Sequence, residues 1–127
     1  LNRALELSPA HQQARTLLAT LTKSSEEILK KAEENAAKLN TPEAYLELSL
    51  KYYNHGKYEF CIKSCNMALD LKPDYAEAYN NICSAYNKLG QFEKAVKACE
   101  QALKFKPDYA LAKGNQNWAK KQMEKVQ

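Results

Sequence analysis

The stretch ALDLKPDYAEAY, residues Ala68–Tyr79, returns in nearly the same form as ALKFKPDYALAK at Ala102–Lys113. The likeness extends beyond these letters, because Pro42–Tyr75 and Ala76–Tyr109 align without a gap and are identical at 14 of 34 positions. Self-similarity at one fixed period is typical of repeat architectures, in which each unit buries its apolar face against its neighbours. The chain therefore contains at least two copies of one structural unit.

Each copy has the pattern of two helices joined by a turn. In the second copy, Tyr79, Ile82 and Tyr86 are spaced three and four positions apart, which places them on one face of a helix. Gly90 then ends this helix, because glycine readily adopts the positive φ of a helix C-terminus. A second helix with small residues at its core positions follows and stops before Pro107.

A helix–turn–helix unit with these landmarks and this period resembles the tetratricopeptide repeat family. The landmarks of the second copy are Tyr79, Ile82, Cys83, Tyr86, Gly90, Phe92, Ala95, Ala102 and Pro107. Tyr45 and Tyr79 stand where the family usually has tryptophan. The resemblance implies an all-α fold, a right-handed α-solenoid of stacked antiparallel helix hairpins, with about seven helices in this chain.

The two flanks follow the repeat pattern less closely. The N-terminal flank suggests that the chain begins inside a repeat, followed by a helix with Leu17, Leu18 and Leu21 and a further helix that begins at Ser24. Terminal units of solenoids are expected to be atypical. The predicted units are the end of a truncated repeat at 1–11, a degenerate helix pair at 12–41, repeats at 42–75 and 76–109, and a capping helix at 110–127.

The four cysteines are predicted to be unpaired core residues, because all of them fall on the expected buried faces and free cysteine is among the most buried residue types. Cys65 and Cys99 occupy equivalent positions of neighbouring repeats, where packed helices hold Cα atoms about 8–10 Å apart, beyond the reach of a disulfide. Unpaired thiols favour a reducing compartment and hence a cytoplasmic location. Attachment to a membrane enzyme would instead place the domain outside the cytoplasm.

The sequence contains no catalytic or metal-binding constellation. Cys61 and Cys65 are four residues apart rather than three, and only His11 and His55 could complete a zinc site with them. The three glycines are isolated from one another, so there is no glycine-rich phosphate loop. We therefore expect no enzymatic activity, no metal and no cofactor.

The charge pattern bears on the class of partner. The net charge is +4, but the only arginines are Arg3 and Arg15, whereas nucleic-acid binding favours arginine interleaved with aromatic residues on one surface. No apolar stretch approaches the length that crosses a bilayer. We expect a protein or peptide partner, with no nucleic acid and no membrane insertion. Self-association through an apolar N-terminal end is a further expectation.

The resemblance places the functional surface on the first helix of each pair, which lines the concave side of the superhelix in this family. An extended peptide or a partner helix would bind there. The candidate groove residues are Leu46, Leu50, Tyr53, Asn54, Asn80, Asn81, Ser84, Asn87, Asn115 and Trp118. The alternative is that these side chains only solvate the inner face, or that Leu46 and Leu50 contact the preceding helices.

Two known uses of such grooves can be compared with this chain. Chaperone-binding members of the family clamp a terminal carboxylate with lysine, arginine and asparagine. The matching positions here are Leu46, Leu50, Asn81, Leu111 and Asn115, and none of them is a lysine or an arginine. We therefore expect no carboxylate clamp. O-linked N-acetylglucosamine transferases hold peptide backbone with a ladder of asparagines, and Asn81 and Asn115 match two of its rungs, since an amide both donates and accepts.

The run PDYALAKGNQNWAKKQ near the C-terminus is similar to the closing segment of repeat domains attached to bacterial membrane glycosyltransferases. The alternative function is therefore an accessory or structural domain of a larger enzyme, with no ligand of its own.

Overall fold

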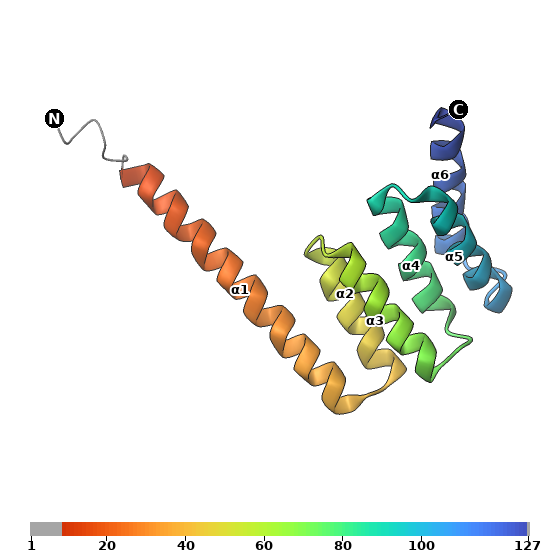
Figure 1. The fold of residues 1–127 in the computed structure, drawn as a ribbon, viewed down its shortest axis with the longest axis horizontal. Coiled ribbons are helices and arrows are strands. Elements are labelled where there is room, and N and C mark those ends of the chain that lie inside the picture. Colours follow the sequence, from red (N-terminus) through yellow and green to blue (C-terminus); the bar gives the residue numbers. More distant parts are fainter. Residues whose placement is uncertain (1–8, 127) are drawn as a thin grey trace.

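The computed structural model describes residues 9–126, without the side chains of Thr22 and Val126. Six α-helices make up this part of the chain, and it holds no strand (Figure 1). The helices are α1 Pro9–Leu39, α2 Pro42–Asn54, α3 Tyr58–Leu71, α4 Ala76–Leu89, α5 Phe92–Phe105 and α6 Ala110–Val126. The predicted all-α stack of helix pairs is confirmed.

Two antiparallel hairpins, α2/α3 and α4/α5, form the centre of the stack, and α6 packs against the second of them. Thr41 caps α2, because its hydroxyl accepts a hydrogen bond from the Ala44 amide at 3.1 Å. Gly90 adopts a φ of 76° at the end of α4, a left-handed conformation that favours glycine. These local signals fix where the helices begin and end, and hence the stacking of the hairpins.

The core between the helices consists largely of alanine and cysteine. Nine such residues are completely buried in α3, α4 and α5: Cys61, Cys65, Ala68, Ala78, Cys83, Ala85, Ala95, Cys99 and Ala102. Larger side chains such as Tyr45, Leu48 and Ile82 surround this small-residue layer and are almost fully buried. The small residues allow the helix backbones to approach closely, and tight interior packing makes the positions sensitive to added volume.

The predicted helix pair at 12–41 is wrong, because α1 is one continuous helix of 31 residues. Ser24 was interpreted as the start of a second helix, but no glycine or proline lies between Pro9 and Leu39 to break the first. A mid-helix serine costs only about 0.5 kcal/mol relative to alanine. The described part of the chain consequently has six helices rather than the predicted seven or so.

Only the C-terminal half of α1 packs on the stack. Leu29, Ala32 and Ala36 are buried there, and the Tyr52 hydroxyl of α2 donates a hydrogen bond to the Glu33 carboxylate. Burial raises the pKa of Tyr52, and the neighbouring Glu33 carboxylate adds to the effect. The N-terminal half projects away from the other helices, as Figure 1 shows in red and orange.

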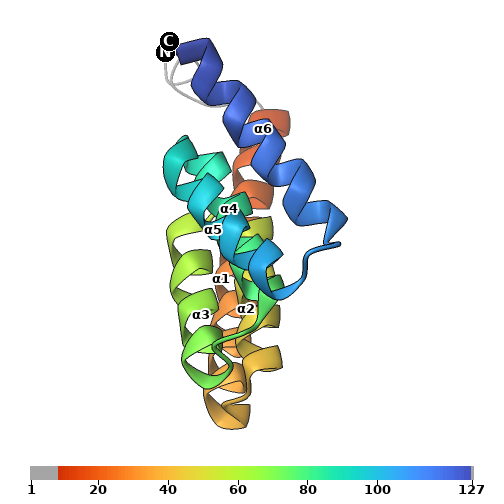
Figure 2. The same ribbon diagram turned by 90° about the vertical axis from the view of Figure 1, so that its right-hand side faces the viewer.

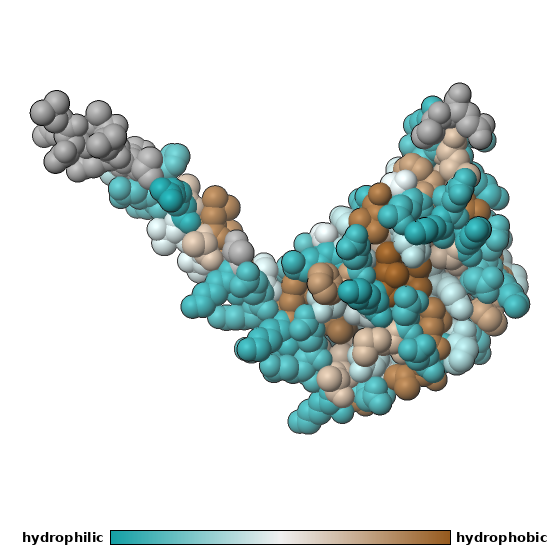
Figure 3. Space-filling model, in the orientation of Figure 1, coloured by the Kyte–Doolittle hydropathy of each residue, from teal (hydrophilic) through white to brown (hydrophobic). Residues whose placement is uncertain are grey.

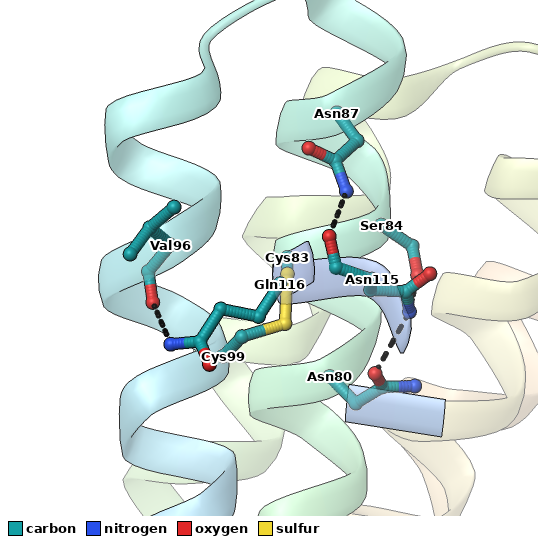
Figure 4. The surroundings of a disulfide bond; sticks show 8 residues. All are labelled: Asn80, Cys83, Ser84, Asn87, Val96, Cys99, Asn115 and Gln116. Carbon is teal, nitrogen blue, oxygen red and sulfur yellow. Dashed lines mark hydrogen bonds between the residues drawn. A yellow bond between two sulfur atoms is a disulfide. The ribbon is translucent and has the colours of Figure 1, made fainter. Parts of the chain in front are cut away.

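The prediction of four unpaired cysteines is also wrong. Cys83 of α4 and Cys99 of α5 form a disulfide, with their Cα atoms 5.4 Å apart, whereas Cys61 and Cys65 are free and buried (Figure 4). Equivalent positions of neighbouring repeats are too far apart for a disulfide, but the two helices of one hairpin cross closely enough to form one. The predicted burial of all four cysteines is correct, but the argument for a reducing compartment loses its basis.

In the first hairpin, Ser49 and Cys65 are the repeat equivalents of Cys83 and Cys99, and their side chains are in hydrogen-bond contact. We expect Ser49→Cys to form a disulfide with Cys65 and to raise the free energy of unfolding by about 1–2 kcal/mol, less than the ideal value because engineered disulfides usually strain the native state. Thiol titration and melting with and without reductant would measure this. Asn66→Cys, exposed on α3, is the control and should only add a free thiol to the two already present. If Ser49→Cys has three free thiols, no new disulfide has formed and the prediction is wrong.

None of the helices in residues 9–126 combines the length and the apolar character that spanning a bilayer requires.

Candidate functional site

The candidate groove lies on the layer formed by α2, α4 and α6, the first helices of successive pairs. In this layer α4 contacts both α2 and α6. Figure 2, in which α5 and α6 face the viewer, shows α3 on one side of the stack and α2 on the other. The residues predicted to face a partner therefore belong to one continuous surface of three helices.

A pocket of about 330 Å³ opens where these three helices meet. Its lining residues are Tyr53, Ser84, Asn87, Lys88, Asn115 and Trp118. Five of the six are predicted groove residues, and Lys88 adds one exposed cation. Trp118 packs edge-on against Phe92 with ring centroids 5.6 Å apart and still exposes 47% of its surface, so it forms a firmly held apolar wall.

A network of asparagine side chains joins α4 to α6 at the pocket. Asn115 Nδ2 donates to both Asn80 Oδ1 and Ser84 Oγ at 2.9 Å, and Asn87 Nδ2 donates to the Asn115 carbonyl at 3.1 Å (Figure 4). The structure places Asn80 differently from the prediction, because only 5% of it is exposed and its amide oxygen is occupied by Asn115. Asn80 holds α6 in place and does not line the groove.

A parallel contact joins α2 to α4. Asn81 Nδ2 donates to Ser49 Oγ at 3.3 Å, and the fully buried Ser49 donates in turn to the Leu46 carbonyl. Leu46 is half-buried against the core, so it fits the alternative of a packing residue, whereas Leu50 stays 46% exposed beside the groove. Asn54 lies exposed at the end of α2.

These contacts orient the side chains that remain available to a ligand. Protein atoms engage both protons of the Asn115 amide, but only one of the two amide protons of Asn81. Their Oδ1 atoms have no hydrogen-bond partner among residues 9–126, and the buried Oδ1 of Asn87 has none there either. A ligand in the groove therefore meets amide oxygens, which accept hydrogen bonds.

The two ends of the groove differ in charge. Glu43 and Glu77 lie in the first turns of α2 and α4, and Lys88 lies in the last turn of α4. Burial raises the pKa of Tyr75, and the carboxylates of Glu43 and Glu77 raise it further because they disfavour a phenolate nearby. The groove thus runs from an acidic end to a basic one, although Lys106 partly compensates Glu77 at 3.8 Å.

The described residues bring no three histidine, cysteine, aspartate or glutamate side chains close enough together to hold a metal ion.

Residues 76–109 match the family model described as tetratricopeptide repeat. The α4/α5 hairpin is therefore a tetratricopeptide repeat. The match comprises α4, α5 and the disulfide between them, and the helix pair α2/α3 repeats the same arrangement. No curated protein matches the sequence significantly.

Solved tetratricopeptide repeat domains have the same fold. The second such domain of human RPAP3, in complex with the HSP70 peptide SGPTIEEVD, is 20% identical with a TM-score of 0.69; the alignment covers 85% of this chain and 91% of that one. The first domain of Spaghetti (RPAP3), bound to the HSP90 peptide SRMEEVD, is 19% identical with a TM-score of 0.72, covering 87% and 89%. The Sgt2 domain from Aspergillus fumigatus is 14% identical, with a TM-score of 0.72 and coverage of 94% and 82%.

Proposed function

We propose that this tetratricopeptide repeat domain is a protein-interaction module that holds an extended segment or a helix of a partner protein in the groove of α2, α4 and α6. The observation that carries the proposal is the pocket of about 330 Å³, to which all three helices contribute side chains. Two domains with the same fold hold peptides in their solved complexes, which supports the same general use of the fold here.

The partner segment should provide an apolar side chain and hydrogen-bond donors. Leu50, Tyr53 and Trp118 offer apolar and aromatic surface, and burying one aliphatic side chain against it contributes about 1.5–3 kcal/mol. The exposed amide oxygens of Asn81 and Asn115 can accept hydrogen bonds from peptide N–H groups. An internal stretch of a partner chain meets both requirements.

A terminal carboxylate fits this groove poorly. At Asn81 and Asn115 a carboxylate would meet two amide oxygens, and a single N–H group, on Asn81, remains to donate to it. Lys88 is the only cation that lines the pocket. We therefore expect the peptide SRMEEVD, which the Spaghetti domain binds, not to bind here.

The test begins with peptides selected from a random library on the immobilised domain, which are then titrated against variants. Asn81→Ala should weaken binding by about 5- to 150-fold, the equivalent of the 1–3 kcal/mol that an unpaired buried donor costs. The melting temperature should fall only slightly, because the half-buried Asn81 makes a single long hydrogen bond to Ser49.

Lys94→Ala is the matched control, because Lys94 is exposed on α5 outside the α2, α4 and α6 layer. It should change neither affinity nor melting. If the selected peptides bind Asn81→Ala and the unmodified domain equally well, the binding surface lies elsewhere. Tight binding of SRMEEVD would contradict the proposed preference for internal segments.

A further inference from the structure

The projecting half of α1 carries large apolar side chains that the other described helices leave uncovered. Leu17 exposes 61% of its surface, Leu21 59% and Ile28 49%. Figure 3 shows apolar surface on this part of α1, away from the rest of the stack. Isolated helices are only marginally stable in water, and most helices gain their stability by packing an apolar face.

The exposed residues of this half form a regular seam. Ala10, Ala14, Leu17, Leu21, Ser24 and Ile28 are spaced alternately by four and three residues. This is the spacing of the a and d positions of a coiled coil. The seam is about 27 Å long at 1.5 Å per residue. Thr16 lies away from the seam and donates to the main-chain carbonyl of Gln12, and Thr20, which flanks the seam, donates to that of Thr16.

We propose that this seam binds a second copy of the same chain, as an antiparallel pair of α1 helices related by a twofold axis. In the antiparallel register centred between Leu17 and Leu21, every a position meets a d position of the other copy. Leu17 then packs on Leu21, Ala14 on Ser24 and Ala10 on Ile28. The central layer pairs two leucines, the next pairs two small side chains, and the outer layer pairs alanine with the larger isoleucine. The seam is therefore complementary to a second copy of itself.

Charge and space agree with this register. At the positions that flank the seam, Gln13 lies opposite Glu27 of the other copy. Arg15 and Lys23 point away from the interface, so no like charges meet across it. The first buried residue of α1 is Leu29, just beyond the end of the seam, and Ile28 itself is still exposed. A second α1 can therefore lie along the seam without displacing α2.

The oligomeric state tests the proposal first. We expect sedimentation velocity to show a concentration-dependent dimer. Leu17→Glu combined with Leu21→Glu should raise the dissociation constant at least about tenfold, because the new carboxylates would lose hydration in the interface. Leu17→Ala with Leu21→Ala keeps high helix propensity and should weaken the dimer too. Met67→Glu, at an exposed apolar residue of α3 away from the seam, is the control and should leave the dimer intact.

Cross-linking tests the orientation. An equimolar mixture of Leu17→Cys and Leu21→Cys chains should form a disulfide-linked heterodimer on mild oxidation, whereas either variant alone should not cross-link. Cross-linking of Leu17→Cys to itself would show a parallel pair and overturn the register. A chain that remains monomeric at the highest concentration it tolerates, or a dimer unaffected by both double variants, would overturn the proposal itself.

Discussion

Replacing Ala102 by tryptophan should lower the free energy of unfolding by about 3 kcal/mol, at the upper end of the usual cost of overpacking. Ala102 is completely buried in α5, one turn from Cys99 and within the layer of small residues where the helices approach closely. An indole has no space there unless α5 moves away from its neighbours. Urea unfolding followed by far-ultraviolet circular dichroism would measure the loss.

Ala37→Trp is the matched control, because Ala37 is exposed on α1 and its replacement should cost almost nothing. Ala68→Trp is the repeat equivalent in α3, where the alanine is also completely buried, and it should destabilise the domain to a similar degree. If Ala102→Trp and Ala37→Trp unfold at the same urea concentration, the assignment of a small-residue core is wrong.

The positions of these small residues could be predicted from the sequence because the repeat makes each one visible twice. Ala68 and Ala102 recur one period apart, and both are fully buried. Gly90 adopts the predicted positive φ, and α5 ends at Phe105, just ahead of Pro107. Such features depend on local backbone chemistry, which a short stretch of sequence contains in full.

Two features of the structure could not be predicted from the sequence: the continuity of α1 and the pairing of Cys83 with Cys99. The break expected at Ser24 does not occur, because a capping residue only permits a helix start and cannot enforce it while the apolar periodicity continues. The pairing of Cys83 with Cys99 follows from how closely α4 and α5 cross, a distance that the spacing of the two residues does not reveal.

The candidate groove was predicted only in part, for a similar reason. Register placed Asn80, Asn81 and Asn115 on the correct helices, but it could not show which of their amide groups contact neighbouring helices. Asn80 is engaged in a packing contact, Asn115 keeps only its amide oxygen for a ligand, and Asn81 keeps its oxygen and one N–H group. The polarity that the groove offers to a partner therefore emerges from the hydrogen-bond network rather than from residue type.

Reduction of the Cys83–Cys99 disulfide should lower the free energy of unfolding by about 3 kcal/mol. The bond joins residues 16 apart, and closing a loop of this size removes about that much conformational free energy from the unfolded chain. The helices should keep their arrangement after reduction, because both cysteines are completely buried and a thiol packs as a small apolar group. Urea unfolding with and without a strong reductant would measure the difference.

The variant with Cys83→Ala and Cys99→Ala separates the disulfide from other effects of the reductant. It should unfold near the midpoint of the reduced parent, and adding reductant should not change its stability. Cys61→Ala is the control for thiol loss, since Cys61 is free, and its response to reductant should equal that of the parent. Mass spectrometry should first show that the disulfide is intact in the oxidised parent and broken in the reduced one. If the two samples then unfold at the same urea concentration, the disulfide does not stabilise the domain. The difference should be largest in the α4/α5 hairpin, and hydrogen exchange of its amides would show this directly.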